Sequence, residues 1–143
     1  MIYDRSHTRQ IPELGGMGKV MPFAMIGFII GGLVSMGMPG FSGFVAEFPI
    51  FMGVWGRQWL VAVAASISII ITAAYIMRNI RQVFFSPMPD EVAKHHLTDI
   101  TVLDKVAIAT LCLFMIGIGL FPSIMVPMID TGVQNILRLL GGA

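Results

Sequence analysis

The stretch GMPGFSGFVAEFPIFMG, residues 37–53, decides the fold because it lies in the middle of a long apolar segment. Within residues 20–56 of that segment, Glu47 is the only charged side chain. A straight helix over this range would be roughly 55 Å long, whereas the hydrocarbon core of a bilayer is about 30 Å thick. The segment is therefore too long for one ordinary membrane crossing.

The same stretch contains the residues that interrupt a helix. Pro39 removes a backbone donor and clashes with the preceding turn, and three glycines around it add backbone freedom. These glycines are Gly37, Gly40 and Gly43. The sequence predicts a discontinuous transmembrane helix over 20–56 that is broken near 37–43, with halves over about 21–37 and 43–56.

The composition of the chain is that of an integral membrane protein. Of its 143 residues, 56% are hydrophobic and only 12% are charged, about half the charged fraction that is usual for a soluble domain. Two further apolar stretches, with charged residues only near one end of each, predict transmembrane helices over 58–82 and 103–121. Polar loops are expected over 1–19 and 83–102. The tail over 122–143 is expected to form a short interfacial helix, because its apolar residues Val133, Ile136, Leu137 and Leu140 share one helical face.

The predicted fold class is an all-α integral membrane protein with about three transmembrane helices, the first of them discontinuous. The first stretch has two possible geometries, a single broken span or a re-entrant hairpin. Cytoplasmic loops carry an excess of Lys and Arg, and the single span gives the stronger bias. It places seven basic residues on one side: Arg5, Arg9, Lys19, Arg78, Arg81, Lys94 and Lys105. We therefore expect loops 1–19 and 83–102 to be cytoplasmic, with Arg57 and the C-terminus on the opposite side.

Glu47 is the strongest candidate for a functional residue. It lies ten residues before Arg57, so about 15 Å of helix separates it from the membrane edge. An ionised carboxylate at that depth costs about 3 kcal/mol or more, and such residues usually mark ion or proton pathways. The alternative is a structural carboxylate that caps the free amides of the second half-helix.

Hydroxyl groups near the break could hold water beside this carboxylate. The possible polar lining consists of Ser35, Ser42, Ser68, Thr72 and Tyr75. For the last three, which lie in the second span, ordinary packing between membrane helices is the competing interpretation.

Other residues do not indicate a cofactor site. His95–His96 is a lone pair, and a metal centre needs more ligands, so no metal site is predicted. Cys112 is the only cysteine, which excludes a disulfide within the chain. Arg78 and Arg81 are interpreted as anchors of a cytoplasmic helix end. The sequence has no cluster of basic residues of the kind that binds nucleic acid, so no nucleic-acid partner is predicted.

The chain resembles the antiporter-like M subunit, or chain 4, of proton-translocating NADH:quinone oxidoreductase, which is respiratory complex I. The resemblance rests on four pieces in order along the sequence: the DRSHTR loop at 4–9, the LGGM at 14–17, the GMPGFSGFVAEFPIFMG at 37–53, and the ITAAY with FFSP at 71–87. Sister subunits and Mrp-type cation/proton antiporters share versions of the third piece.

The resemblance implies that this chain is a C-terminal piece of a proton-translocating subunit in a bacterial-type inner membrane or an equivalent energy-transducing membrane. It implies that Glu47 is a buried proton relay. It also implies three kinds of partner: the family's earlier helices, which this sequence lacks, other membrane subunits, and the lipid bilayer. NADH, flavin, iron–sulfur clusters and quinone are expected in partner subunits, with no cofactor in this chain. An Mrp-type antiporter subunit, a hydrogenase-linked relative and a non-transporting membrane scaffold remain alternatives.

Overall fold

A computed structural model of the protein describes residues 2–89 and 98–141, and all regular elements in these ranges are helices. The five long helices are α3 (Pro22–Ser35), α4 (Ser42–Trp55), α5 (Trp59–Ile80), α7 (Val102–Leu120) and α8 (Val126–Leu139). The short ones are α1 (Tyr3–Ser6), η1 (Ile11–Glu13), α2 (Met17–Val20), η2 (Arg81–Phe85) and η3 (Pro122–Ile124). The prediction of an all-α chain is confirmed for these residues.

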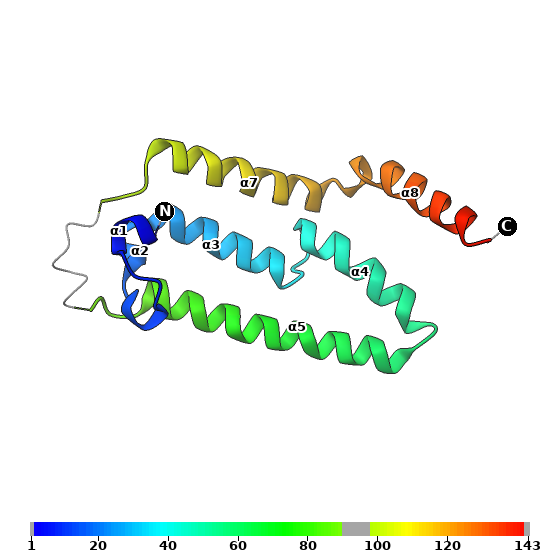
Figure 1. Ribbon diagram of the computed structural model, residues 1–143, viewed down its shortest axis with the longest axis horizontal. Coiled ribbons are helices and arrows are strands. Elements are labelled where there is room, and N and C mark those ends of the chain that lie inside the picture. Colours follow the sequence, from blue (N-terminus) through cyan, green and yellow to red (C-terminus); the bar gives the residue numbers. More distant parts are fainter. Residues whose placement is uncertain (1, 90–97, 142–143) are drawn as a thin grey trace.

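The two halves of the broken helix lie at the centre of the described chain. α3 and α4 follow one another in the same direction, with α5 antiparallel on one side and α7 parallel on the other (Figure 1). Each half contacts both α5 and α7. The break between the halves is therefore enclosed from two sides by continuous helices.

Helix length separates the continuous spans from the discontinuous one. Trp59–Phe85 and Val102–Leu120 are each long and apolar enough to cross a membrane without help. α3 and α4 are apolar too, but each has 14 residues and is thus only about 21 Å long. Together they run the length of α5 (Figure 1).

Local sequence sets the ends of the two continuous helices. α5 passes into a π-helical turn, η2, so helical winding reaches Phe85, beyond the expected end of that span at residue 82. Pro87 and Pro89 follow and cannot continue a helix. α7 begins with a capping box, in which Thr101 and Asp104 each accept a hydrogen bond from the other's backbone N–H.

The small hydrophobic core lies at one end of the bundle, where the polar lead meets η2. The lead was expected to be a loop, and it consists of short helical turns, of which η1 and α2 pack against η2. Met17 and Met21 are fully buried there. The other buried apolar residues of this core are Leu14, Ala24, Ile76, Ile80, Val83, Phe84 and Ile100.

Outside this core, the long helices expose large apolar side chains. Ile70 of α5 is 68% exposed and Leu113 of α7 is 69% exposed. α8 buries none of its residues, although apolar and polar side chains segregate along it. Surfaces of this kind need lipid or other helices to cover them. The interfacial position of α8 remains a prediction.

Candidate functional site at the helix break

α3 ends in a Schellman motif centred on Gly37. The N–H of Met38 donates to the carbonyl of Leu33 (3.2 Å), and the N–H of Gly37 donates to that of Val34 (3.0 Å). Gly37 adopts a left-handed φ of 64°, which the motif requires and which glycine adopts without strain. The last carbonyl groups of the half-helix thus find donors even though the helix stops.

A tight turn then redirects the chain into α4. The N–H of Phe41 donates to the carbonyl of Met38 (3.3 Å), with Pro39 and Gly40 at the two central positions. Gly40 has a φ of 93°. Proline followed by a residue of positive φ is the signature of a type II turn. The break therefore occupies residues 36–41 and consists of two consecutive glycine-dependent turns.

Close backbone contacts hold the two halves and α7 together at this point. A Cβ atom on Gly43, at the start of α4, would overlap the carbonyl oxygen of Val34, near the end of α3. A Cβ atom on Gly119 of α7 would overlap the carbonyl oxygen of Gly40. α4 therefore begins beside the last turn of α3, and the end of α7 lies directly against the break.

Glu47 reaches back from α4 to the break. Its Oε2 atom lies 2.7 Å from the position that a Cβ atom on Gly37 would occupy, so nothing larger than glycine fits there without displacing the carboxylate. The side chain is only partly buried, which differs from the expectation of a buried glutamate. The reason is that α4 buries none of its residues within this chain.

Beside the carboxylate is a hollow of about 220 Å³ between α4 and α5, which we call the α4 pocket. Its lining consists of Glu47, Ile50, Phe51 and Val54 from α4 and Val61, Ala62 and Ala65 from α5. Glu47 is the only ionisable group in this lining. The surface that these residues present to the pocket is apolar, so the carboxylate of Glu47 does not face it.

A second hollow of about 480 Å³ lies between α3 and α5, and we call it the α3 groove. It is lined by Gly27, Phe28, Gly31, Gly32 and Ser35 from α3 and Tyr75 and Ile76 from α5. Of the predicted polar lining, the structure thus brings Ser35 and Tyr75 together. Ser42 is the first residue of α4, while Ser68 and Thr72 line neither hollow.

Pro49 is a feature of the site that sequence reasoning missed. It lies inside α4, two residues after Glu47, and it has no N–H to donate to the carbonyl of Val45. The hydrogen-bond ladder of α4 is therefore interrupted next to the carboxylate as well as at the break. Pro49 is visible in the sequence, but Pro39, ten residues earlier, is sufficient by itself to predict a broken helix.

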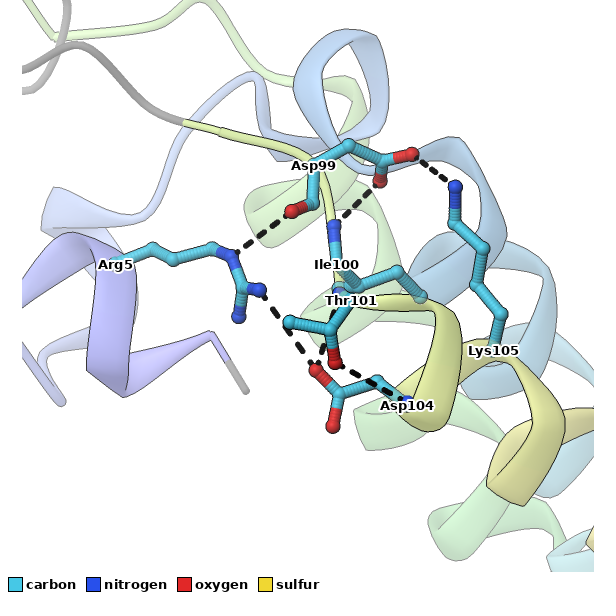
Figure 2. A network of polar contacts seen from close by, with 6 residues as sticks. All are labelled: Arg5, Asp99, Ile100, Thr101, Asp104 and Lys105. Carbon is cyan, nitrogen blue, oxygen red and sulfur yellow. Dashed lines mark hydrogen bonds and ion pairs between the residues drawn. The ribbon is translucent and has the colours of Figure 1, made fainter.

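A polar network ties the lead to the start of α7, at the end of the bundle opposite to the loop between α4 and α5 (Figures 1 and 2). Arg5 donates from Nε to the carbonyl of Asp99 (3.2 Å), and its guanidinium lies 3.7 Å from the carboxylate of Asp104. Lys105 Nζ lies 2.6 Å from the carboxylate of Asp99. This hydrogen bond from Lys105, followed by the backbone N–H of Ile100, lowers the pKa of Asp99. The network fixes the position of the lead against α7.

Residues proposed for other roles lie elsewhere. Arg78 and Arg81 lie at the end of α5, at the same end of the bundle as the polar network. His95 and His96 lie outside the described residues. Cys112 lines an apolar hollow between α3 and α7, away from the α4 pocket.

Comparison with known proteins identifies the family. Residues 1–72, which include the break and Glu47, match the family described as NADH:quinone oxidoreductase/Mrp antiporter, transmembrane. The NAD(P)H-quinone oxidoreductase chain 4 of a Synechococcus sp. is 34% identical over 96% of this chain and 27% of its own length. NADH-quinone oxidoreductase subunit M of Rhodobacter capsulatus is 33% identical over 96% and 27%, respectively.

The fold has a counterpart of known structure. A chain of respiratory complex I from Thermus thermophilus with bound NADH superposes with a TM-score of 0.75 at 26% identity, covering 84% of this chain and 25% of that chain. This chain spans about a quarter of the length of the relatives it matches. On the match over residues 1–72, the chain belongs to the NADH:quinone oxidoreductase/Mrp antiporter transmembrane family.

Proposed function

We propose that this chain is the C-terminal part of a proton-translocating membrane subunit of NADH:quinone oxidoreductase, and that Glu47 carries protons at the helix break. The observation that carries the proposal is the position of the carboxylate. The carboxylate of Glu47 lies against the break at Gly37, beside backbone that is not part of a regular helix. Membrane proteins place irregular backbone only inside protein or along a water-filled cavity.

The chemistry of the site suits reversible protonation. A carboxylate that takes up a proton becomes neutral, and this removes the cost of a charge in a low-dielectric environment. The nearby peptide groups of residues 36–41 and the unpaired carbonyl expected at Val45 can hold water molecules that deliver or remove the proton. Discontinuous helices serve ion coupling in other transporters in the same way.

The rest of the machinery is proposed to belong to partners. In this scheme the redox chemistry of NADH, flavin, iron–sulfur clusters and quinone occurs in other subunits. Other membrane helices, including those of the three-quarters of its relatives that this chain does not span, cover Glu47 and complete the path. The chain itself crosses an energy-transducing membrane with α3 and α4 as one span and the lead on the cytoplasmic side.

The test is Glu47→Gln in the assembled complex, with proton uptake and NADH oxidation measured in the same membrane vesicles. We expect fewer protons moved per NADH oxidised, because the amide has the size of the carboxylate but cannot take up a proton. Glu47→Asp is the matched control, since it keeps a titratable group, and it should retain part of the pumping. Unchanged pumping by Glu47→Gln at unchanged assembly would favour a structural carboxylate and the scaffold alternative.

The second candidate function is that of an Mrp-type cation/proton antiporter subunit, because the matched family includes both kinds of protein. The two candidates differ in energy source. Purification of the chain with its native partners separates them: a complex that oxidises NADH supports the first, and one that exchanges cations for protons without a redox reaction supports the second.

A further inference from the structure

The short connection between α4 and α5 carries both tryptophans of the chain, with a basic residue between them. Trp55 is the last residue of α4, Trp59 is the first residue of α5, and Arg57 lies midway. The two tryptophans are 61% and 60% exposed, respectively. Tryptophan is enriched where a membrane meets water, because its ring is apolar and its N–H is polar. The connection therefore has the composition of a segment at a membrane surface.

Arg57 is an isolated charge at this end of the bundle. In the sequence, the next charged residue before it is Glu47 and the next after it is Arg78, at the far end of α5. Trp59–Phe85 is long and apolar enough to cross a membrane, so Arg57 lies just outside the first residue of a span. The connection lies at the end opposite to the polar lead (Figure 1). Lipid headgroups, rather than acyl chains, surround a protein at this level.

The guanidinium of Arg57 makes no hydrogen bond or ion pair with any residue that the structure describes. The backbone of the turn is nevertheless well fixed, because the N–H groups of Arg57 and Gln58 both donate to the carbonyl of Val54 (3.1 and 2.8 Å). Arginine is suited to phosphate, because its planar guanidinium presents paired N–H donors to two phosphate oxygens. The side chain of Arg57 is exposed and can make this interaction.

A hollow of about 310 Å³ lies beside Arg57. Its lining is polar at Arg57 and Gln58 and apolar at Trp59, Leu60 and Val61, which continue into the span. A phospholipid has the same two parts in the same order, since its phosphate lies at the membrane surface and its acyl chains extend inward. The hollow therefore matches an amphipathic ligand better than a free anion.

We infer that this hollow, with Arg57 as its charged group, binds an anionic phospholipid in the leaflet opposite to the lead. The net charge of the ligand follows from the surroundings of Arg57. Glu47 is the nearest acidic residue in the sequence, ten positions and about 15 Å of helix away, so it leaves the positive charge of Arg57 largely uncompensated. That charge favours an anionic headgroup over a zwitterionic one. The inference does not depend on whether Glu47 carries protons.

The test uses the purified, assembled complex in phosphatidylcholine vesicles that contain a small fraction of phosphatidylglycerol with a diazirine next to its headgroup. After illumination, mass spectrometry of the digested chain locates the attached lipid. We expect attachment within residues 55–61 that added phosphatidylglycerol prevents and that phosphatidylcholine or inorganic phosphate does not prevent. Absence of attachment there would show that another subunit covers the connection, and prevention by inorganic phosphate would show a site for a free anion. Either result overturns the inference.

Substitutions of Arg57 test the role of its charge. For Arg57→Gln we expect half-maximal attachment to need about fivefold more phosphatidylglycerol, since one basic residue contributes about that factor at an anionic surface. Arg57→Lys keeps the charge without the paired donors and should fall between the two. Arg78→Gln is the matched control, because it makes the same change of charge at an exposed residue near the other end of α5. It should leave attachment within residues 55–61 unchanged. Attachment to an assembled Arg57→Gln complex at the concentrations that suffice for the unsubstituted complex would overturn the inference.

Discussion

At the scale of single residues, Gly37 and Glu47 form the central pair of the site. Gly37 has a left-handed φ of 64°, which favours glycine, and a Cβ atom there would lie 2.7 Å from a carboxylate oxygen of Glu47, which would have to move. Gly40 also has a positive φ, of 93°, but a Cβ atom there would meet nothing within 4 Å. A comparison of substitutions at the two glycines therefore distinguishes the effect of backbone strain from the effect of contact with Glu47.

Substitution of each glycine by alanine makes this separation measurable. A non-glycine residue in a left-handed conformation costs about 1–3 kcal/mol, and both variants incur that cost. Gly37→Ala must in addition displace the carboxylate of Glu47. The tip of a glutamate side chain can move at little cost, so we expect both substitutions to lower the thermal unfolding midpoint of the purified complex by similar amounts and Gly37→Ala to lower proton pumping more. Equal proton pumping by the two variants would contradict a functional contact between Gly37 and Glu47.

At the scale of elements, the break shows which features a sequence can reveal. The two turns depend on residues that are neighbours in the chain, so Pro39, Gly37 and Gly40 predict them from the local sequence. The overlap at Gly43 and the contact of Gly119 with the break depend on how separate helices pack, and no local pattern contains that information. The partial exposure of Glu47 has the same origin, because the burial of a side chain depends on how separate helices pack around it.

The contact between α7 and the break yields a prediction with an internal control. Gly119→Ala places a methyl group against the carbonyl oxygen of Gly40, whereas a Cβ atom on Gly117, one half-turn earlier in α7, would meet nothing within 4 Å. Overpacking costs about 1–3 kcal/mol, while alanine is preferred over glycine in a helix by about 1 kcal/mol. We expect Gly119→Ala to lower the thermal unfolding midpoint of the complex and Gly117→Ala to leave it unchanged or raise it. A lower midpoint for Gly117→Ala alone would contradict this packing.

At the scale of the whole molecule, the described helices form an open bundle rather than a closed one. The polar lead, the end of α5 and the start of α7 gather at one end, and the loop between α4 and α5 lies at the other (Figure 1). Apolar side chains face outward along most of its length. An arrangement of this kind fits a piece that is completed by further membrane helices, with its polar groups at the two membrane surfaces.

The same arrangement makes a prediction about topology. If α3 and α4 form one span, then Gly56, after α4, and Thr98, before α7, lie on opposite sides of the membrane, because an odd number of crossings separates them through α5. The excess of basic residues at the Thr98 end predicts that this end is cytoplasmic. Gly56→Cys and Thr98→Cys, each in a Cys112→Ala background, should therefore react with a membrane-impermeant thiol reagent from opposite faces of sealed vesicles. A third cysteine, Gln10→Cys in an exposed part of the lead, should react from the same face as Thr98→Cys, because one discontinuous span and α5 together return the chain to its starting side. Reaction of Gln10→Cys and Gly56→Cys from one face would instead establish a re-entrant hairpin and contradict a single span made of α3 and α4.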